Sequence, residues 1–193
     1  MKRCLFQISP GFYLCMALLL MLLPIKWVLC WFVTTTVHEI SHFVTLRILG
    51  AKVLRVRIGI RGVVMETEAV DDYTEILSAA AGPFCGGLLL LLYPYSREIF
   101  ICALFQTVYN LLPIYPQDGG RILFILLAKQ VGEGRAFRIM EGVRLAIFAC
   151  VCLIIIYLLL FKKDILFAAI LISLFAVIWI GKITCKDSEQ IVQ

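Results

Sequence analysis

Long apolar runs, separated by short polar segments, constrain the fold of this chain more than any other feature. A helix needs about 20 mostly apolar residues to cross a bilayer. Only 16% of the 193 residues are charged and 62% are hydrophobic, whereas a soluble domain carries about 25% charged residues. The sequence therefore predicts an all-α polytopic membrane protein with about six transmembrane helices, over residues 5–23, 27–49, 73–92, 99–128, 145–161 and 165–180.

The length fits a single integral-membrane domain over residues 1–193. The motifs that carry chemistry fall within about residues 27–130, and two further spans occupy residues 145–180. Lys2 and Arg3, ahead of the first run, are typical of a signal peptide. No small-residue cleavage site follows them, so we interpret the first run as a retained anchor.

The basic residues predict the orientation of the chain in the membrane. The net charge of +5 comes from residues placed between apolar runs, which suits anionic lipid headgroups better than nucleic acid. With the N-terminus inside, six spans leave few of the 18 basic residues outside, namely Lys26, Arg97, Lys162 and Lys163. The positive-inside rule then predicts that both termini are cytoplasmic.

Residues 53–68 differ from the apolar runs. VLRVRIGI alternates apolar and basic side chains with a period of two, which predicts a strand, and VVMETE predicts a second one. We therefore expect a small interfacial β-hairpin. It has two interpretations: an amphipathic hairpin on the membrane surface, or a strand edge around Val56 and Ile58 that binds an extended substrate by backbone pairing.

The eight cysteines do not form a metal-binding or disulfide pattern. Most of them lie inside apolar runs and none belongs to a C-x-x-C pair. We expect free thiols that pack as small apolar side chains.

The only two histidines of the chain form the sequence His38-Glu39-Ile40-Ser41-His42. Residues four apart lie one turn above each other on the same face of a helix, so both imidazoles can bind one zinc ion. Glu39 then lies beside the metal, where it can accept a proton from zinc-activated water. A pair of satisfied polar residues in a helix interface is the alternative, and ionisable groups within a span favour function over it.

A third zinc ligand must come from a carboxylate, because catalytic zinc usually has three protein ligands and the chain has no other histidine. Asp118 lies in the broken region at 99–128, directly before Gly119 and Gly120, which permit close backbone approach. Non-helical backbone at membrane depth is tolerated where protein buries it or where it lines a wet cavity. We therefore expect Asp118 to be a ligand, with a solvated turn residue as the alternative.

Two motifs in this order resemble the site-2 protease family of intramembrane zinc metalloproteases: HExxH at residues 38–42 and NxxPxxxxDGG at residues 110–120. The pattern is similar to the compact bacterial branch of that family, the stage IV sporulation proteases. The resemblance covers roughly residues 27–130. Gly82-Pro83 resembles a small-residue break between the two motifs, but Gly86 stands where family members often carry asparagine.

The resemblance implies a hydrolase that cleaves a peptide bond within or near a transmembrane segment, by attack of zinc-activated water. It assigns one Zn²⁺ to the two histidines and Asp118, with Glu39 as the general base. Asn110 and Pro113 would shape the loop beside the scissile peptide. The implied partners are a single-span membrane protein or membrane-tethered precursor as substrate, and a regulatory membrane protein, in a bacterial cytoplasmic membrane.

Three other functions fit part of the pattern. A catalytically silent, protease-like scaffold would bind a membrane partner without cutting it, although such a binder has no use for Glu39. A metal transporter would use the histidines as a transit site, but transporters often show internal symmetry between halves, and none is visible here. A zinc hydrolase acting on lipids or on a prenylated terminus is the third.

Overall fold

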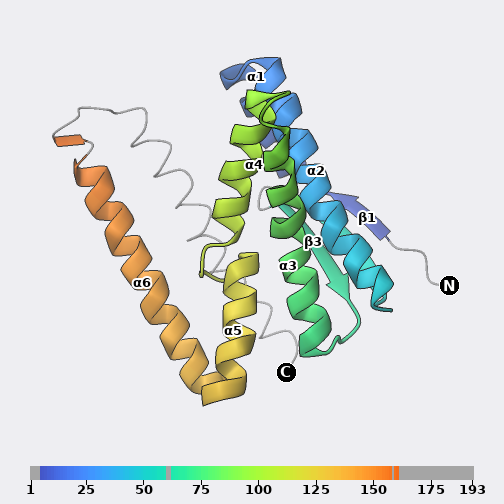
Figure 1. The fold of residues 1–193 in the computed structure, drawn as a ribbon, viewed down its shortest axis with the longest axis vertical. Helices are drawn as coiled ribbons and strands as arrows, with labels where there is room; N and C mark the ends of the chain where they lie inside the picture. The colour runs from blue at the N-terminus through green and yellow to red at the C-terminus, as the bar shows by residue number, and fades with distance from the viewer. Residues whose placement is uncertain (1–4, 60–61, 158, 161–193) are drawn as a thin grey trace.

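The computed structural model describes residues 5–59, 62–157 and 159–160, and Figure 1 shows their arrangement. Most of these residues are helical. The helices are α1 (Pro10–Leu22), α2 (Ile25–Ile48), α3 (Asp72–Leu88), the short 3-10 helix η1 (Leu89–Leu92), α4 (Arg97–Asn110), α5 (Asp118–Val131) and α6 (Glu133–Tyr157). The strands are β1 (Leu5–Ile8), β2 (Val53–Gly59) and β3 (Gly62–Thr67).

Helices α2 to α5 form the centre of the molecule (Figure 1). Helix α2 contacts α3 and α4, and α3 contacts α4 and α5. Helix α4 ends near the middle of this bundle, and α5 begins there beside α3. Helix α6 contacts α5, while α1 contacts the start of the bundle through α2. The connection between α4 and α5 is partly buried, since its residue Ile114 is 1% exposed.

The hairpin predicted near residues 53–68 is confirmed, but it belongs to a three-stranded sheet. Strand β2 pairs antiparallel with β3 on one side and parallel with β1 on the other. Its residue Val56 lies opposite Met65 of β3 and Phe6 of β1. The mostly helical fold with a small hairpin is therefore as expected, and the addition of β1 as a third strand is the part that the sequence did not predict.

The same finding corrects the first predicted span. Residues 5–8 form strand β1, and helix α1 starts only at Pro10, whose fixed φ suits the first turn of a helix. Both elements are mostly apolar, so composition does not distinguish the strand from the helix. A four-residue segment also has too few positions for a period of 2 or 3.6 to show.

The sheet is attached to the C-terminal half of α2 by an apolar core. Val53 and Val56, the inward side chains of β2, are 4% exposed and pack with Leu46 of α2. Phe43 of α2 and Met65 of β3 complete this cluster. The two valines are three residues apart, and a register shift between Val53 and Arg55 lets both face the helix that carries the two histidines.

Two of the described helical segments are long and apolar enough to cross a membrane, Asp72–Leu92 and Glu133–Tyr157. The first matches the predicted third span, and the helix continues through Pro83 without the expected interruption. The second begins well before the predicted fifth span at 145–161. The predicted sixth span, at 165–180, lies outside the described residues, and the count of six spans stays a prediction.

Helix α3 begins at a defined cap. Asp71 accepts hydrogen bonds from the Thr74 backbone N–H and hydroxyl, at 3.4 and 2.6 Å. The hydroxyl bond lowers the pKa of the Asp71 carboxyl.

The expectation of free thiols also holds for the described part of the chain, in which six cysteines are unpaired.

Candidate metal centre

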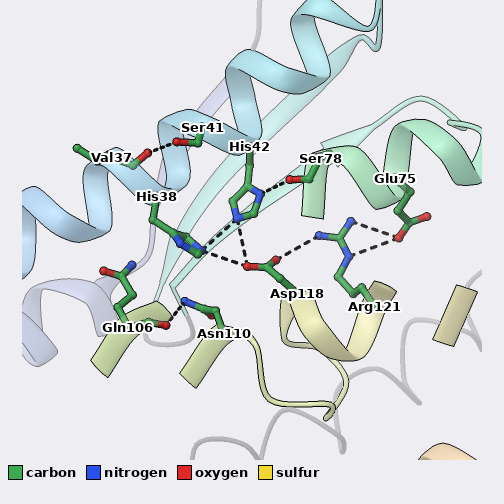
Figure 2. Close-up of polar contacts among 10 residues, drawn as sticks. All are labelled: Val37, His38, Ser41, His42, Glu75, Ser78, Gln106, Asn110, Asp118 and Arg121. Carbon is green, nitrogen blue, oxygen red and sulfur yellow. Dashed lines mark hydrogen bonds and ion pairs between the residues drawn. The ribbon is translucent and has the colours of Figure 1, made fainter. Parts of the chain in front are cut away.

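His38 and His42 lie one turn apart on α2 and converge on one point, as their spacing predicted. Their Nε2 atoms are 3.1 Å apart, and the two rings meet edge to face with centroids 4.7 Å apart. Both side chains are buried: His38 is 2% exposed and His42 is 7% exposed. Figure 2 shows the rings pointing from α2 toward α5.

Asp118 is the first residue of α5 and supplies the third side chain of the cluster. Its Oδ2 atom lies 3.1 Å from His38 Nε2 and 3.3 Å from His42 Nε2. The carboxylate is buried, at 7% exposed, and Oδ2 has no other hydrogen-bond partner in the described part of the chain. The structure therefore brings together the three side chains that the sequence selected as ligands (Figure 2).

Two glycines after Asp118 allow α5 to start at this position. A Cβ atom at Gly119 would lie 2.6 Å from the Leu111 carbonyl carbon, and one at Gly120 would lie 2.5 Å from the Tyr115 backbone nitrogen. Any other residue at either position would push α5 away from the connecting loop. Ile114 anchors that loop, because its side chain is 1% exposed. The predicted close backbone approach is therefore confirmed.

A third glycine, Gly82 of α3, lies directly against both imidazole rings. A Cβ atom at Gly82 of α3 would lie 2.7 Å from His38 Cε1 and would also collide with Nε2 of His42. Because helix α3 runs beside α2, only a residue without a side chain at this point lets both rings turn toward Asp118. The sequence motif marked Gly82 only as a break; its contact with both rings depends on helix packing.

A backbone carbonyl fixes the ring of His42. The Ser78 carbonyl oxygen of α3 lies 2.7 Å from His42 Nδ1. A carbonyl can only accept, so Nδ1 carries the proton and Nε2 presents its lone pair to the cluster. This is the arrangement that metal-bound histidines commonly have.

The cluster fits a tetrahedral zinc ion. Zinc binds imidazole nitrogen and carboxylate oxygen at about 2.0–2.2 Å, so tetrahedral ligand atoms are separated by roughly 3.4 Å. The separations here are 3.1 to 3.3 Å. Asp118 Oδ2 is a buried carboxylate oxygen that faces a histidine lone pair, and a cation between them would offset the cost of this burial. Two imidazoles and one carboxylate leave a fourth position open, which is typical of catalytic zinc sites.

A cleft of about 1220 Å³ reaches the cluster from the side of the sheet. Its lining includes the three ligand side chains and Glu39, which is half-buried and adjacent to His38. The sheet contributes Ile58, Gly59 and the β3 segment from Gly62 to Met65. The small-molecule pockets of proteins measure about 300–1,000 Å³, so this cleft has room for a longer ligand.

The structure separates the four residues expected to contact substrate. Asn110 and Ile58 line the cleft, and the Asn110 side chain donates a hydrogen bond to the Gln106 carbonyl oxygen at 3.1 Å. Pro113 lies in the loop between α4 and α5, outside the cleft lining. Val56 is buried in the core of the sheet. Because β2 is paired on both sides at this position, its backbone has no free edge for a substrate.

Sequence reasoning missed a polar link beside the cluster. Arg121 of α5 donates two hydrogen bonds to Glu75 Oε1 of α3, at 3.4 and 3.2 Å. Its other terminal nitrogen lies 4.0 Å from Asp118 Oδ1. Arg121 follows Asp118 by three residues on a helix, so that spacing was a signal available in the sequence. The partner Glu75 could not be found without the packing of α3 against α5.

Two proteins share sequence similarity with the chain. It is 27% identical over 126 residues to zinc metalloprotease MJ0392 of Methanocaldococcus jannaschii, covering 58% of this chain and 37% of that protein. It is 27% identical over 163 residues to stage IV sporulation protein FB of Bacillus subtilis, covering 77% of this chain and 55% of that protein. The resemblance to the site-2 proteases is confirmed.

The fold agrees with the site-2 protease resemblance. The solved structure of the site-2 protease from Methanocaldococcus jannaschii matches with a TM-score of 0.61 at 22% identity, covering 90% of this chain and 88% of that one. No family model matches the sequence. The matched regions span only about half, or less, of the two named relatives.

Proposed function

We propose that this chain is a zinc-dependent intramembrane endopeptidase. The observation that carries the proposal is the convergence of His38, His42 and Asp118 in the wall of a cleft that Glu39 also lines. The two histidines and the aspartate would hold one zinc ion. A zinc ion bound there would polarise a carbonyl group and make water acidic enough to attack it near neutral pH.

Glu39 is the general base in this proposal. It follows His38 directly on α2 and lines the cleft, yet it is not one of the three clustered ligand side chains. Its carboxylate accepts the proton of the attacking water and passes it to the leaving amine as the peptide C–N bond breaks. Removing such a base typically lowers the rate by about 10²–10⁴-fold.

We also propose that the substrate is a segment of a membrane protein. Two described helices are long and apolar enough to span a bilayer. Large apolar side chains are exposed on the outer surface, including Met21 at 83% and Ile48 at 78%, and lipid would cover such side chains. A site built on these helices would meet a substrate that lies within or near the membrane, such as a single-span protein or a membrane-tethered precursor.

The substrate would bind as an extended strand along β3. This strand lies at the edge of the sheet, and its residues from Gly62 to Met65 line the cleft. A helical substrate hides its carbonyl groups in hydrogen bonds, so it must unwind before it is cut. Pairing with an exposed strand edge holds an unwound segment extended. Strand β3 takes the role that the sequence had suggested for Val56 of β2.

The proposal is tested with purified protein in detergent and a panel of single-span membrane proteins. We compare the wild type with Glu39→Gln, and use Glu133→Gln, an exposed residue at the start of α6, as the matched control. The wild type and Glu133→Gln should cut at least one substrate at a defined bond. Glu39→Gln should hold zinc as the wild type does and cut about 10²–10⁴-fold more slowly.

Two results would contradict the proposal. Zinc binding without cleavage of any substrate by the wild type would favour the silent scaffold. Equal cleavage by the wild type and Glu39→Gln would remove Glu39 from the mechanism. Product analysis by mass spectrometry distinguishes peptide hydrolysis from cleavage of a lipid or a prenylated terminus.

A further inference from the structure

The two candidate ligand histidines differ in how their second ring nitrogen is satisfied. His42 Nδ1 donates to the Ser78 carbonyl oxygen. His38 Nδ1 is buried and has no hydrogen-bond partner among residues 5–59, 62–157 and 159–160. A histidine that presents Nε2 to a metal carries its proton on Nδ1 and almost always donates that proton to an acceptor. The cluster therefore needs an acceptor next to His38.

A threonine hydroxyl and this nitrogen both lie near one glycine of α3, Gly86. Thr107 of α4 is 9% exposed, and its Oγ1 atom is also buried without a hydrogen-bond partner among the residues that the structure describes. A Cβ atom built at Gly86 of α3 would lie 2.6 Å from Thr107 Oγ1 and 3.9 Å from His38 Nδ1. The two unpaired atoms thus flank one point in the bundle, and Gly86 keeps that point free of a side chain.

Helix α3 also contains a carbonyl whose usual helical hydrogen bond is lost. Ala79, Gly82 and Gly86 follow each other at spacings of three and four, so they share one side of the helix. Pro83 has no N–H, and the Ala79 carbonyl therefore lacks its usual helical donor. A buried water needs two to four polar partners, and His38 Nδ1 and Thr107 Oγ1 are two such groups near one point.

We propose that Thr107 is a positioning residue of the metal centre. Its hydroxyl holds a buried water that accepts the His38 Nδ1 proton, and this contact fixes the ring with Nε2 toward the metal. Gly86 provides the room, and it stands where the family resemblance led us to expect asparagine. The inference rests on the proposed zinc site, and it adds an outer partner for His38 that matches Ser78 for His42.

Zinc affinity measured by competition with a chromogenic chelator tests this role without any substrate. Thr107→Val keeps the side-chain volume and removes the hydroxyl, and loss of an outer partner typically weakens metal binding by 10- to 100-fold. Thr107→Ser should restore affinity to within about threefold, because it keeps the hydroxyl. The matched control is Thr34→Val on α2, a buried threonine whose hydroxyl already donates to the Trp31 carbonyl oxygen at 2.9 Å.

The absorption spectrum of the Co²⁺-substituted protein provides a second measurement. Thr107→Val should shift the ligand-field bands as the His38 ring reorients, whereas Thr34→Val should leave them unchanged. If Thr107→Val misfolds and does not elute as a single species in size-exclusion chromatography, Gly86→Ala replaces it. This variant places a methyl group between Thr107 and His38, and Gly87→Ala is its control. A Cβ at Gly87 meets nothing within 4 Å.

The outcomes separate this inference from the proposed function. The role of Thr107 is overturned if the wild type binds zinc and Thr107→Val has the same zinc affinity and Co²⁺ spectrum as the wild type. That result would leave the proposed zinc site intact. A wild type that does not bind zinc overturns both. Weaker binding in Thr107→Val that Thr107→Ser restores supports the role.

Discussion

At the scale of single residues, Asp118 depends on neighbours that the sequence motif does not contain. Arg121 lies between the Asp118 carboxylate and Glu75, and so joins the start of α5 to the first turn of α3. Its guanidinium is 34% exposed, so solvent weakens the attraction. Its main effect is therefore to hold Asp118 in one orientation, with Oδ2 toward the histidines.

We predict that Arg121→Met lowers zinc affinity by a few-fold to about tenfold. This is less than the effect of removing a fully buried hydrogen-bond partner of a ligand. Glu75→Gln should have a smaller effect in the same direction, since it leaves the arginine in place. Chelator competition measures both. Arg138→Met on α6 is the control, because that arginine is exposed and its Nε donates only to the nearby Gly134 carbonyl oxygen. Equal affinities in Arg121→Met and Arg138→Met would show that Arg121 does not orient Asp118.

Gly82 gives the second prediction at this scale. Gly82→Ala should abolish or strongly weaken zinc binding, because the added methyl group would occupy the space of both imidazole rings. Gly87→Ala lies on the same helix and meets open space, so it should bind zinc normally. A gain in helix propensity of at most about 1 kcal/mol would leave Gly87→Ala as stable as the wild type or slightly more so. Normal zinc content in Gly82→Ala would contradict the observed packing.

At the scale of elements, local sequence patterns predicted the features that depend only on neighbouring residues. The histidine spacing requires only a helix, and α2 covers the predicted segment. The glycines and prolines between 110 and 120 predicted the break before α5, and strand alternation predicted the β2–β3 hairpin. Strand β1 was missed because its partner is distant in sequence and its mostly apolar residues are separated from the apolar α1 only by Ser9.

The sheet provides a prediction about substrate binding. A photoactivatable residue at Val64 of β3, which is 52% exposed and lines the cleft, should cross-link a bound substrate. The same group at Leu54 of β2, which is 41% exposed and outside the cleft lining, should not. Gel analysis after irradiation, in the Glu39→Gln background to retain substrate, measures both. Equal cross-linking at the two positions would exclude β3 as the docking edge.

At the scale of the whole molecule, the site depends on contacts among four helices that no motif specifies. Composition and the two motifs were enough to select Glu39 and the three ligand side chains. The supporting contacts of Ser78, Gly82 and Arg121 were not predicted, since they arise where α3 packs against α2 and α5. The number of spans and the orientation in the membrane stay predictions.

The central claim is that the two histidines and Asp118 bind zinc, and the metal content of the purified protein tests it most directly. Elemental analysis should find about one zinc per chain in the wild type, as expected for a site with two histidines and one carboxylate. Asp118→Asn should lose most of this zinc. Asp72→Asn should retain it, because Asp72 is exposed and pairs with Lys129. A wild type without zinc after incubation with the metal, or an Asp118→Asn variant with full zinc content, would contradict the account.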